Sequence, residues 1–264
     1  MKHVLVTGAG GGMGMAITRK LTQGGYFVFA MDCRDFESGE NTRKIICDVQ
    51  SSESVKAAFE TVRAECDTFE AIVHTAGIYD LDSLVEMSEE RFTRIFDINL
   101  FGLYRLNKEF LPLLKKGSKI IITSSELAPL DPLPFTGIYA ITKAAVEKYA
   151  YSLRMEMNLL GISVSVIRPG ATKTPLLGDS TSALDKFVEN TKIYKTNSAR
   201  FKKIVDGVEA RNVEPKVIGD VAYRIITAKI PRYVYNINRN PLLLILNALP
   251  QRLQNFIIKM ILST

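Results

Sequence analysis

The stretch "HVLVTGAGGGMG", residues 3–14, joins a short apolar run to a glycine-rich segment. The run is typical of a buried strand, and helical periodicity begins at Met13, so the glycines connect a strand to a helix. Such a turn lets the backbone approach a pyrophosphate, whose charge is favoured by the free amides at a helix N-terminus. The pattern predicts a dinucleotide site or, alternatively, only a tight turn. Its candidate cofactor-binding residues are Gly8, Gly10, Gly12, Met13 and Gly14.

Further apolar runs alternate with helical patterns along the chain. The runs are residues 26–32, 44–49, 69–77, 118–125 and 162–170, and residues 232–239 offer a seventh strand. The helical patterns cover residues 13–23, 52–66, 88–114 and 139–160. Because the runs lack strict polar alternation, they are typical of buried parallel strands. The order predicts an α/β Rossmann fold: a doubly wound, mostly parallel seven-stranded sheet with helices on both faces and a ligand beyond the carboxyl ends of the strands.

The composition is compatible with one domain over residues 1–264. The chain is 47% hydrophobic and 23% charged, enough for a sizeable core, and we find no linker or repeat that divides it. The N-terminus does not resemble a secretory signal, so a cytoplasmic location is expected. The cysteines lack the paired spacing of metal ligands, and we expect neither a metal nor a disulfide.

Asp32 closes the second predicted strand, at the distance from the glycine segment that a ribose contact requires. A carboxylate there accepts hydrogen bonds from ribose hydroxyls and repels a 2′-phosphate, which favours NAD over NADP as the cofactor. Arg34, two residues further on, would instead favour NADP, since a guanidinium pairs well with a phosphate. Asp48, followed by Val49, either accepts a bond from the adenine amino group or caps the next helix.

The segment "YAITK" places Tyr139 and Lys143 on one face of a predicted helix. A free tyrosine has a pKa of about 10, which is too high for a base near neutrality. The positive charge of Lys143 would favour the phenolate. The pair is therefore a candidate general acid/base, although two residues on a solvated helix face would show the same spacing.

Together these motifs resemble the classical short-chain dehydrogenase/reductase family over nearly the whole chain. The apolar C-terminal segment resembles that of some hydroxysteroid and retinol dehydrogenases in this family. The further landmarks are "TAG" at residues 75–77, "DINL" around Asn99, the Ser124 and Ser125 pair, and "RPGATKT" at residues 168–174. His74 departs from the pattern, since the family usually has asparagine there. We expect a buried, hydrogen-bonded histidine at that position.

The resemblance implies a set of catalytic residues, which are Asn99, Ser125, Tyr139 and Lys143. Ser125 would bind the reacting oxygen, while Ser124 is structural. The spacing from Ser125 to Tyr139 is one residue longer than the commonest family spacing, and the proline-rich loop between them can absorb it. Asn99 would hold a water that links Lys143 to solvent, or would only satisfy backbone groups. The further residues implied for the cofactor are Ala76, Gly77, Asn99, Tyr139, Lys143, Pro169, Gly170, Thr172 and Thr174.

Residues 175–215 are the least regular part of the sequence and are expected to form a mobile lid over the substrate. Apolar contacts are expected from Leu176, Leu177, Phe187 and Tyr194. An anionic tail could contact Lys186, Lys192 and Lys195, although solvated lysines are an equal alternative. The formal net charge is +6, with basic residues concentrated beyond Asp185, yet no nucleic-acid-binding motif accompanies them, so no nucleic acid partner is expected.

The C-terminal extension, residues 241–264, is apolar at helical spacing and is interrupted by Pro250. No apolar run there is long enough to span a bilayer. Three interpretations remain open: a flap over a hydrophobic substrate, a subunit contact in a homodimer or homotetramer, and a peripheral membrane anchor.

The sequence thus predicts an NAD-dependent oxidoreductase that transfers hydride between nicotinamide and the hydroxyl or ketone of a hydrophobic substrate, such as a steroid or another lipid alcohol. The alternatives are a reductase of small ketones or sugars, and a dinucleotide-sensing module with little turnover. The complete set of acid/base residues argues against the sensor.

Overall fold

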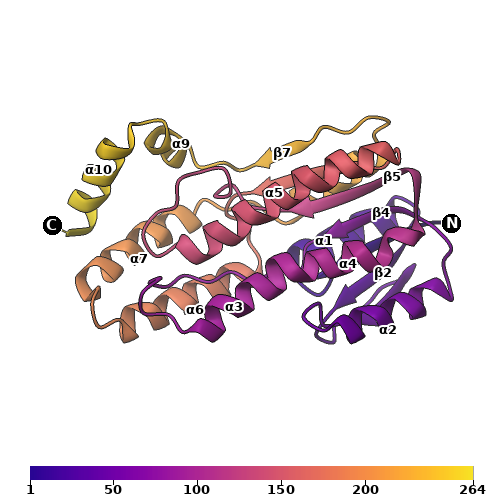
Figure 1. Ribbon diagram of the computed structural model, residues 1–264, viewed down its shortest axis with the longest axis horizontal. Helices are drawn as coiled ribbons and strands as arrows, with labels where there is room; N and C mark the ends of the chain where they lie inside the picture. Colours follow the sequence, from indigo (N-terminus) through magenta and orange to yellow (C-terminus); the bar gives the residue numbers. More distant parts are fainter. Residues whose placement is uncertain (264) are drawn as a thin grey trace.

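The computed structural model describes the backbone of residues 1–263 and the side chains of this range, except those of residues 175–181 and 209. Within it, seven parallel strands form one sheet in the order β3-β2-β1-β4-β5-β6-β7 (Figure 1). The strands are β1 Lys2–Thr7, β2 Tyr26–Asp32, β3 Thr42–Ile46, β4 Phe69–His74, β5 Leu114–Thr123, β6 Ser163–Pro169 and β7 Val234–Ile237. The predicted doubly wound sheet is confirmed.

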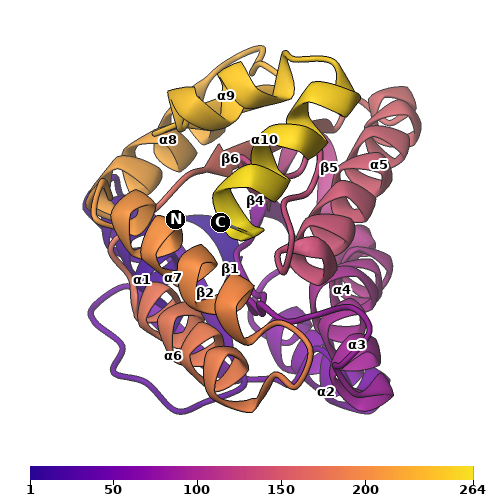
Figure 2. The ribbon, with the colours of Figure 1, turned by 90° about the vertical axis from the view of Figure 1, so that its left-hand side faces the viewer.

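Helices cover both faces of this sheet (Figure 2). Side chains alternate along each strand, so Val4 and Val6 of β1 join one core cluster while Leu5 joins the other. Helices α1 and α8 pack on the first face, and α2, α4 and α5 on the second. The helices are α1 Gly12–Gln23, α2 Ser52–Arg63, α3 Glu89–Phe96, α4 Gly102–Phe110, α5 Gly137–Leu159, α6 Pro175–Asn190, α7 Lys195–Glu209, α8 Lys216–Thr227, α9 Pro241–Asn247 and α10 Gln251–Ser263.

The helical pattern of residues 88–114 is not one regular helix. A π-helical turn, Asp97–Phe101, separates α3 from α4, and a short 3-10 turn, Leu111–Leu113, leads into β5. Single π turns widen a helix locally and are frequent at functional sites. This one carries Asn99, which is buried.

Residues 175–215, the least regular part of the sequence, are nevertheless largely helical, and their role as a mobile lid stays a prediction. This region forms α6 and α7, and these helices pack against each other. Phe187 and Tyr194 do not line the cavity at the carboxyl ends of the strands, and their rings pack around Phe135 at centroid distances of 4.8 and 5.2 Å. The predicted contacts of Leu176 and Leu177 lie outside the described side chains.

The C-terminal extension forms α9 and α10, which Pro250 separates. Both lie with α6 and α7 at the end of the molecule where the strands terminate (Figure 1). Helix α10 packs on α7, where Leu262 is buried and its carbonyl accepts a hydrogen bond from Asn197 Nδ2 at 2.7 Å. Among the described residues, no helix is long and apolar enough to cross a membrane.

Candidate active site

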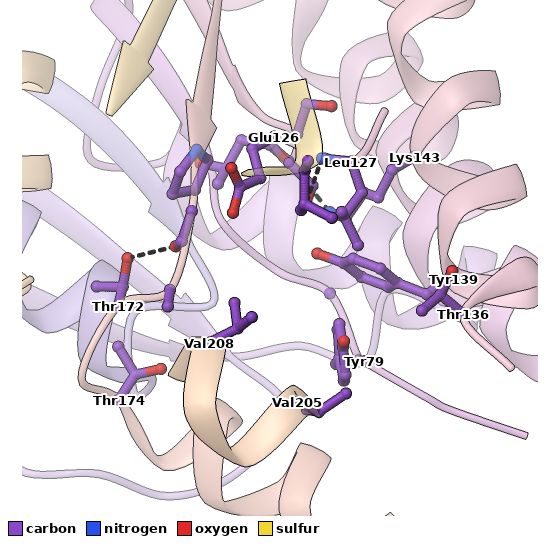
Figure 3. Close-up of a pocket in the computed structure, with 18 of the residues that line it drawn as sticks. Tyr79, Glu126, Leu127, Thr136, Tyr139, Lys143, Thr172, Thr174, Val205 and Val208 are labelled. Atoms are coloured by element: carbon purple, nitrogen blue, oxygen red, sulfur yellow. Dashed lines mark hydrogen bonds between the residues drawn. The ribbon is translucent and has the colours of Figure 1, made fainter. Parts of the chain in front are cut away.

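A cavity lies at the carboxyl ends of β4, β5 and β6, as the doubly wound topology predicts (Figure 3). Its floor contains the residues that follow these strands, and α5 contributes Tyr139 and Lys143. The opposite wall is apolar and comes mainly from α7, with one residue from α9 and one from the loop before α5. That wall consists of Leu133, Phe201, Ile204, Val205, Val208 and Leu243.

Tyr139 and Lys143 lie one turn apart on α5, and both are buried. Lys143 Nζ is 5.7 Å from the centroid of the Tyr139 ring and donates a hydrogen bond to the Thr123 carbonyl at 3.2 Å. Burial raises the pKa of Tyr139 to about 12, although a hydrogen bond with Ser125 opposes this shift. Burial lowers the pKa of Lys143 to about 8, opposed by the charge of Glu147. At neutral pH the pair is therefore a phenol beside an ammonium, which is the proton-donating form.

The two neighbouring serines point to different partners. Ser125 bonds the Tyr139 hydroxyl, and its own Oγ accepts a bond from the Leu127 N–H at 3.2 Å. Ser124 Oγ instead donates to Glu147 Oε1 at 2.9 Å, and Glu147 pairs with Arg168. The structure thus brings Ser125, and not Ser124, to Tyr139.

We expect Ser125→Ala to lower kcat/KM about 10²-fold, because the reacting oxygen loses one hydrogen-bond donor. Ser124→Ala is the matched control: it should change kcat/KM little but destabilise the fold by about 1 kcal/mol, since a buried hydrogen bond to a carboxylate is lost. Steady-state kinetics and thermal unfolding of both variants test this. A larger kinetic loss in Ser124→Ala would assign the role to Ser124.

Asn99 connects the π turn to the loop after β4. Its Oδ1 accepts a bond from the Ile78 N–H at 2.8 Å, and its Nδ2 donates to the Ile78 carbonyl at 3.0 Å and to Thr142 Oγ1 at 3.2 Å. A Cβ on Gly77 would lie 3.1 Å from Asn99 Oδ1 and 3.7 Å from Lys143 Nζ. Asn99 therefore holds the loop backbone beside Lys143, and its predicted role in binding water stays a prediction.

The glycine segment has the geometry that a pyrophosphate site needs. Gly8 has a φ of +68°, and a Cβ there would lie 2.6 Å from the Ala76 nitrogen. A Cβ on Gly14 would lie 2.1 Å from the Gly8 carbonyl oxygen. Helix α1 begins at Gly12, with no acidic residue in its first turn to repel an anion. The residues present therefore fit a dinucleotide phosphate, and Met13 of this segment also lines the cavity.

Asp32 lies beside this loop at the end of β2. Its carboxylate accepts hydrogen bonds from the Gly10 N–H at 3.0 Å and from the Arg34 N–H at 3.1 Å. These bonds hold the carboxylate against the glycine loop, where a ribose hydroxyl could reach it.

The residues that follow β3 do not line the cavity. Asp48 is exposed, and its Oδ1 accepts a bond from the Gln50 N–H at 2.9 Å. The alternative prediction that Asp48 caps the next helix is wrong, since Ser51 caps α2 by accepting from the Ser54 N–H at 3.1 Å. Val49 is buried against Gly102, where a Cβ would lie 2.7 Å from Val49 Cγ2.

The segment after β6 forms the other side of the site, and its predicted residues Pro169, Gly170, Thr172 and Thr174 all line the cavity. A Cβ on Gly170 would lie 2.1 Å from the carbonyl oxygen of Asn238, so the residue that follows β7 packs directly on it. Thr172 Oγ1 donates to the Gly170 carbonyl at 3.0 Å. Thr174 precedes α6 and makes no capping bond with its side chain.

His74 is structural, as expected from the sequence. It is buried, its Nε2 lies 3.0 Å from Asn107 Oδ1, and burial lowers its pKa to about 4. The ring is therefore neutral at physiological pH and lies under the site rather than in the main cavity.

The sequence analysis missed several residues of the cavity, and two of them carry polar groups near Tyr139 or Ser125. Tyr79 lies with its ring centroid 4.3 Å from that of Tyr139. Glu126, directly after Ser125, directs a carboxylate to the cavity (Figure 3). The position of Glu126 next to the serine pair could have indicated that it lines the cavity. In contrast, nothing in the order of residues indicates that α7 and α9 face the cavity.

A doubly wound sheet with a glycine cradle and a buried tyrosine–lysine pair defines an oxidoreductase of the dinucleotide-binding class. The family model described as short chain dehydrogenase matches residues 2–185, so the chain belongs to the short-chain dehydrogenase family. Enzymes of this family act on alcohol or ketone groups and bind a nicotinamide dinucleotide. Hydroxysteroid-type members are among the chain's relatives.

Individual relatives are distant. A 3-ketodihydrosphingosine reductase of Bacteroides thetaiotaomicron is 26% identical over 231 residues, covering 87% of this chain and 85% of that protein. An estradiol 17-beta-dehydrogenase 2 of Mus musculus is 33% identical over 192 residues, which are 67% of this chain but 50% of the mouse protein. The ligand-free structure of Thermoplasma acidophilum aldohexose dehydrogenase has a TM-score of 0.75 at 24% identity, covering 91% of this chain and 95% of that one. This last likeness supports the fold alone.

Proposed function

We propose that the protein is an NAD-dependent oxidoreductase that transfers hydride between nicotinamide and the secondary alcohol or ketone of a hydrophobic substrate, with Tyr139 as general acid/base. The observation that carries this proposal is the cavity itself. The phenol of Tyr139 shares it with the apolar wall from α7 and α9. A sugar would need several hydrogen-bonding groups in that wall, whereas an aliphatic or steroid skeleton needs none.

In the proposed reduction, three side chains have separate roles: Tyr139, Lys143 and Ser125. A bound nicotinamide would supply the hydride that reduces the carbonyl carbon. Tyr139 donates its phenolic proton to the carbonyl oxygen, so that an alcohol forms, and the adjacent Lys143 ammonium stabilises the phenolate left behind. Ser125 orients the oxygen through a hydrogen bond. Oxidation of the alcohol is the same path reversed, with Tyr139 as the base.

The proposed preference for NAD rests on Asp32. Its carboxylate is held beside Gly10 at the carboxyl end of β2, where it would accept bonds from the ribose hydroxyls and repel a 2′-phosphate. We expect NADH to exceed NADPH in kcat/KM by roughly 10-fold or more, the size of one charged hydrogen bond. Asp32→Ala should reduce this ratio towards one, and a wild-type preference for NADPH would contradict the assignment.

The substrate class is tested by absorbance assays of NADH oxidation over matched ketones. The panel contains a steroid ketone, a long-chain aliphatic ketone, a short ketone and a ketose. We expect kcat/KM to rise with apolar area, by about threefold to fourfold for each buried methylene, given ~0.8 kcal/mol per group. Faster reduction of the ketose than of the long-chain ketone would contradict a hydrophobic substrate.

We further propose that α9 and α10 serve as a flap over the substrate. Leu243 of α9 lines the cavity, and α10 packs on α7, which supports this role. Contact with a membrane surface and association into a homodimer or homotetramer remain proposals for the apolar side chains that these helices expose. The exposed ones are Leu242, Ile245, Leu253, Phe256, Met260 and Ile261.

A further inference from the structure

Glu126 is an unusual lining residue for this cavity. Together with Lys143, it is one of the two charged side chains among the described residues that line it. Its backbone N–H donates to the Pro169 carbonyl at 3.0 Å, which fixes it where β5 and β6 end. It is buried, with 7% of its surface exposed. A carboxylate so placed is destabilised unless it is paired with hydrogen-bond donors or with a positive charge.

The protein supplies only part of that pairing. Glu126 Oε2 accepts a hydrogen bond from the Asn240 N–H at 2.6 Å. Oε1 lies beside Gly170, where a Cβ would come within 2.8 Å of it, so the glycine makes room for the carboxylate. A carboxylate has about four acceptor positions, so this bond leaves capacity that faces the cavity.

No described cation completes the pairing. Arg239 is near enough to lower the pKa of Glu126, but burial is the larger influence and raises the pKa above the usual value. Within the described part of the chain, no lysine or arginine forms an ion pair with Glu126. Figure 3 shows its carboxylate between the sides of the cavity formed by Thr172 and by the Tyr139 phenol. The missing partner is therefore expected on the substrate.

We propose that Glu126 binds a positively charged amino group of the substrate, so that the protein acts on hydrophobic amino ketones or amino alcohols. An ammonium matches the carboxylate in charge and brings three donors, whereas a hydroxyl would leave the charge uncompensated. Glu126 and Ser125 line the same cavity, and the charge of Glu126 is near enough to Tyr139 to add to the effect of burial in raising the pKa of its phenol. The amino group is therefore expected close to the carbon that Ser125 and Tyr139 address. This inference rests on the proposed function.

The test compares two ketones of equal chain length, one with an amino group beside the carbonyl and one without it. The measured quantity is the ratio of their kcat/KM values with NADH at pH 7. We expect wild type to favour the amino ketone by about 10- to 100-fold, the factor of a buried charge-assisted hydrogen bond. Glu126→Gln keeps an acceptor for the Asn240 N–H but removes the charge, and should reduce the ratio to about one. Glu60→Gln, an exposed glutamate on α2, is the matched control.

An unchanged ratio in Glu126→Gln would overturn the inference, and so would an equal loss on both ketones, which would place Glu126 against nicotinamide or in the support of Tyr139. The proposed function fails separately, if neither ketone is reduced by wild type. In that case the inference is tested by binding instead. Calorimetry in the presence of NADH measures the affinity for the corresponding amino alcohol and for the plain alcohol. The inference is supported if wild type binds the amino alcohol more tightly than the plain alcohol and Glu126→Gln does not. It is overturned if wild type binds both alcohols equally.

Discussion

Tyr139→Phe is expected to lower kcat by about 10³- to 10⁴-fold, the upper range for loss of a general acid or base. The reason is that Tyr139 carries the phenol that Ser125 bonds, whereas Lys143 Nζ is directed to the Thr123 carbonyl. The phenyl ring keeps its place against Tyr79, whose centroid is 4.3 Å away, so the fold should be retained.

Two measurements separate chemistry from binding in this variant. Single-turnover kinetics report hydride transfer, and fluorescence titration reports the affinity for NADH. We expect this affinity to stay within about twofold of the wild-type value, because the substitution removes an interaction of the transition state rather than of the bound cofactor. Tyr79→Phe is the matched control, since it removes a phenol from the same cavity without removing the proposed acid. Retained turnover in Tyr139→Phe would overturn the assignment of the acid/base.

Gly14→Ala should weaken dinucleotide binding by about 10- to 100-fold, corresponding to the 1–3 kcal/mol that overpacking typically costs. The added Cβ would lie 2.1 Å from the Gly8 carbonyl oxygen and 2.7 Å from Ala9 Cα. Both neighbours are backbone atoms, so the turn itself must open and its amides move away from the pyrophosphate.

The same substitution should lower the melting temperature by roughly 2–12 °C, since 1 kcal/mol corresponds to about 2–4 °C in a domain of this size. Calorimetry with and without NADH measures both effects. Gly207→Ala is the matched control, because a Cβ there meets no atom within 4 Å. Unchanged NADH affinity in Gly14→Ala would show that the loop does not bind the phosphates.

Local features of the chain account for most of the fold that was predicted. Strands such as residues 26–32 are continuous apolar runs because both faces of a parallel sheet are covered, and this composition is visible without any contact being known. Helix α8 was missed although Ile218, Val221, Ala222 and Ile225 recur at helical spacing. The irregular appearance of residues 175–215 was misleading, because α6 and α7 are stabilised by packing on each other and on α10 rather than by a clear amphipathic pattern.

The sequence alone determined the order of the strands, the glycine loop, and the spacing of Tyr139 and Lys143, because each of these depends on residues close together in the chain. The family resemblance implied that Ser125 rather than Ser124 meets Tyr139, and the tertiary structure brings Ser125 and Tyr139 together. The tertiary structure alone decided that α7 and α9 supply an apolar wall and that the Glu126 carboxylate faces the same cavity. Such contacts join segments distant in sequence, and they depend on how the helices pack at the carboxyl ends of the strands.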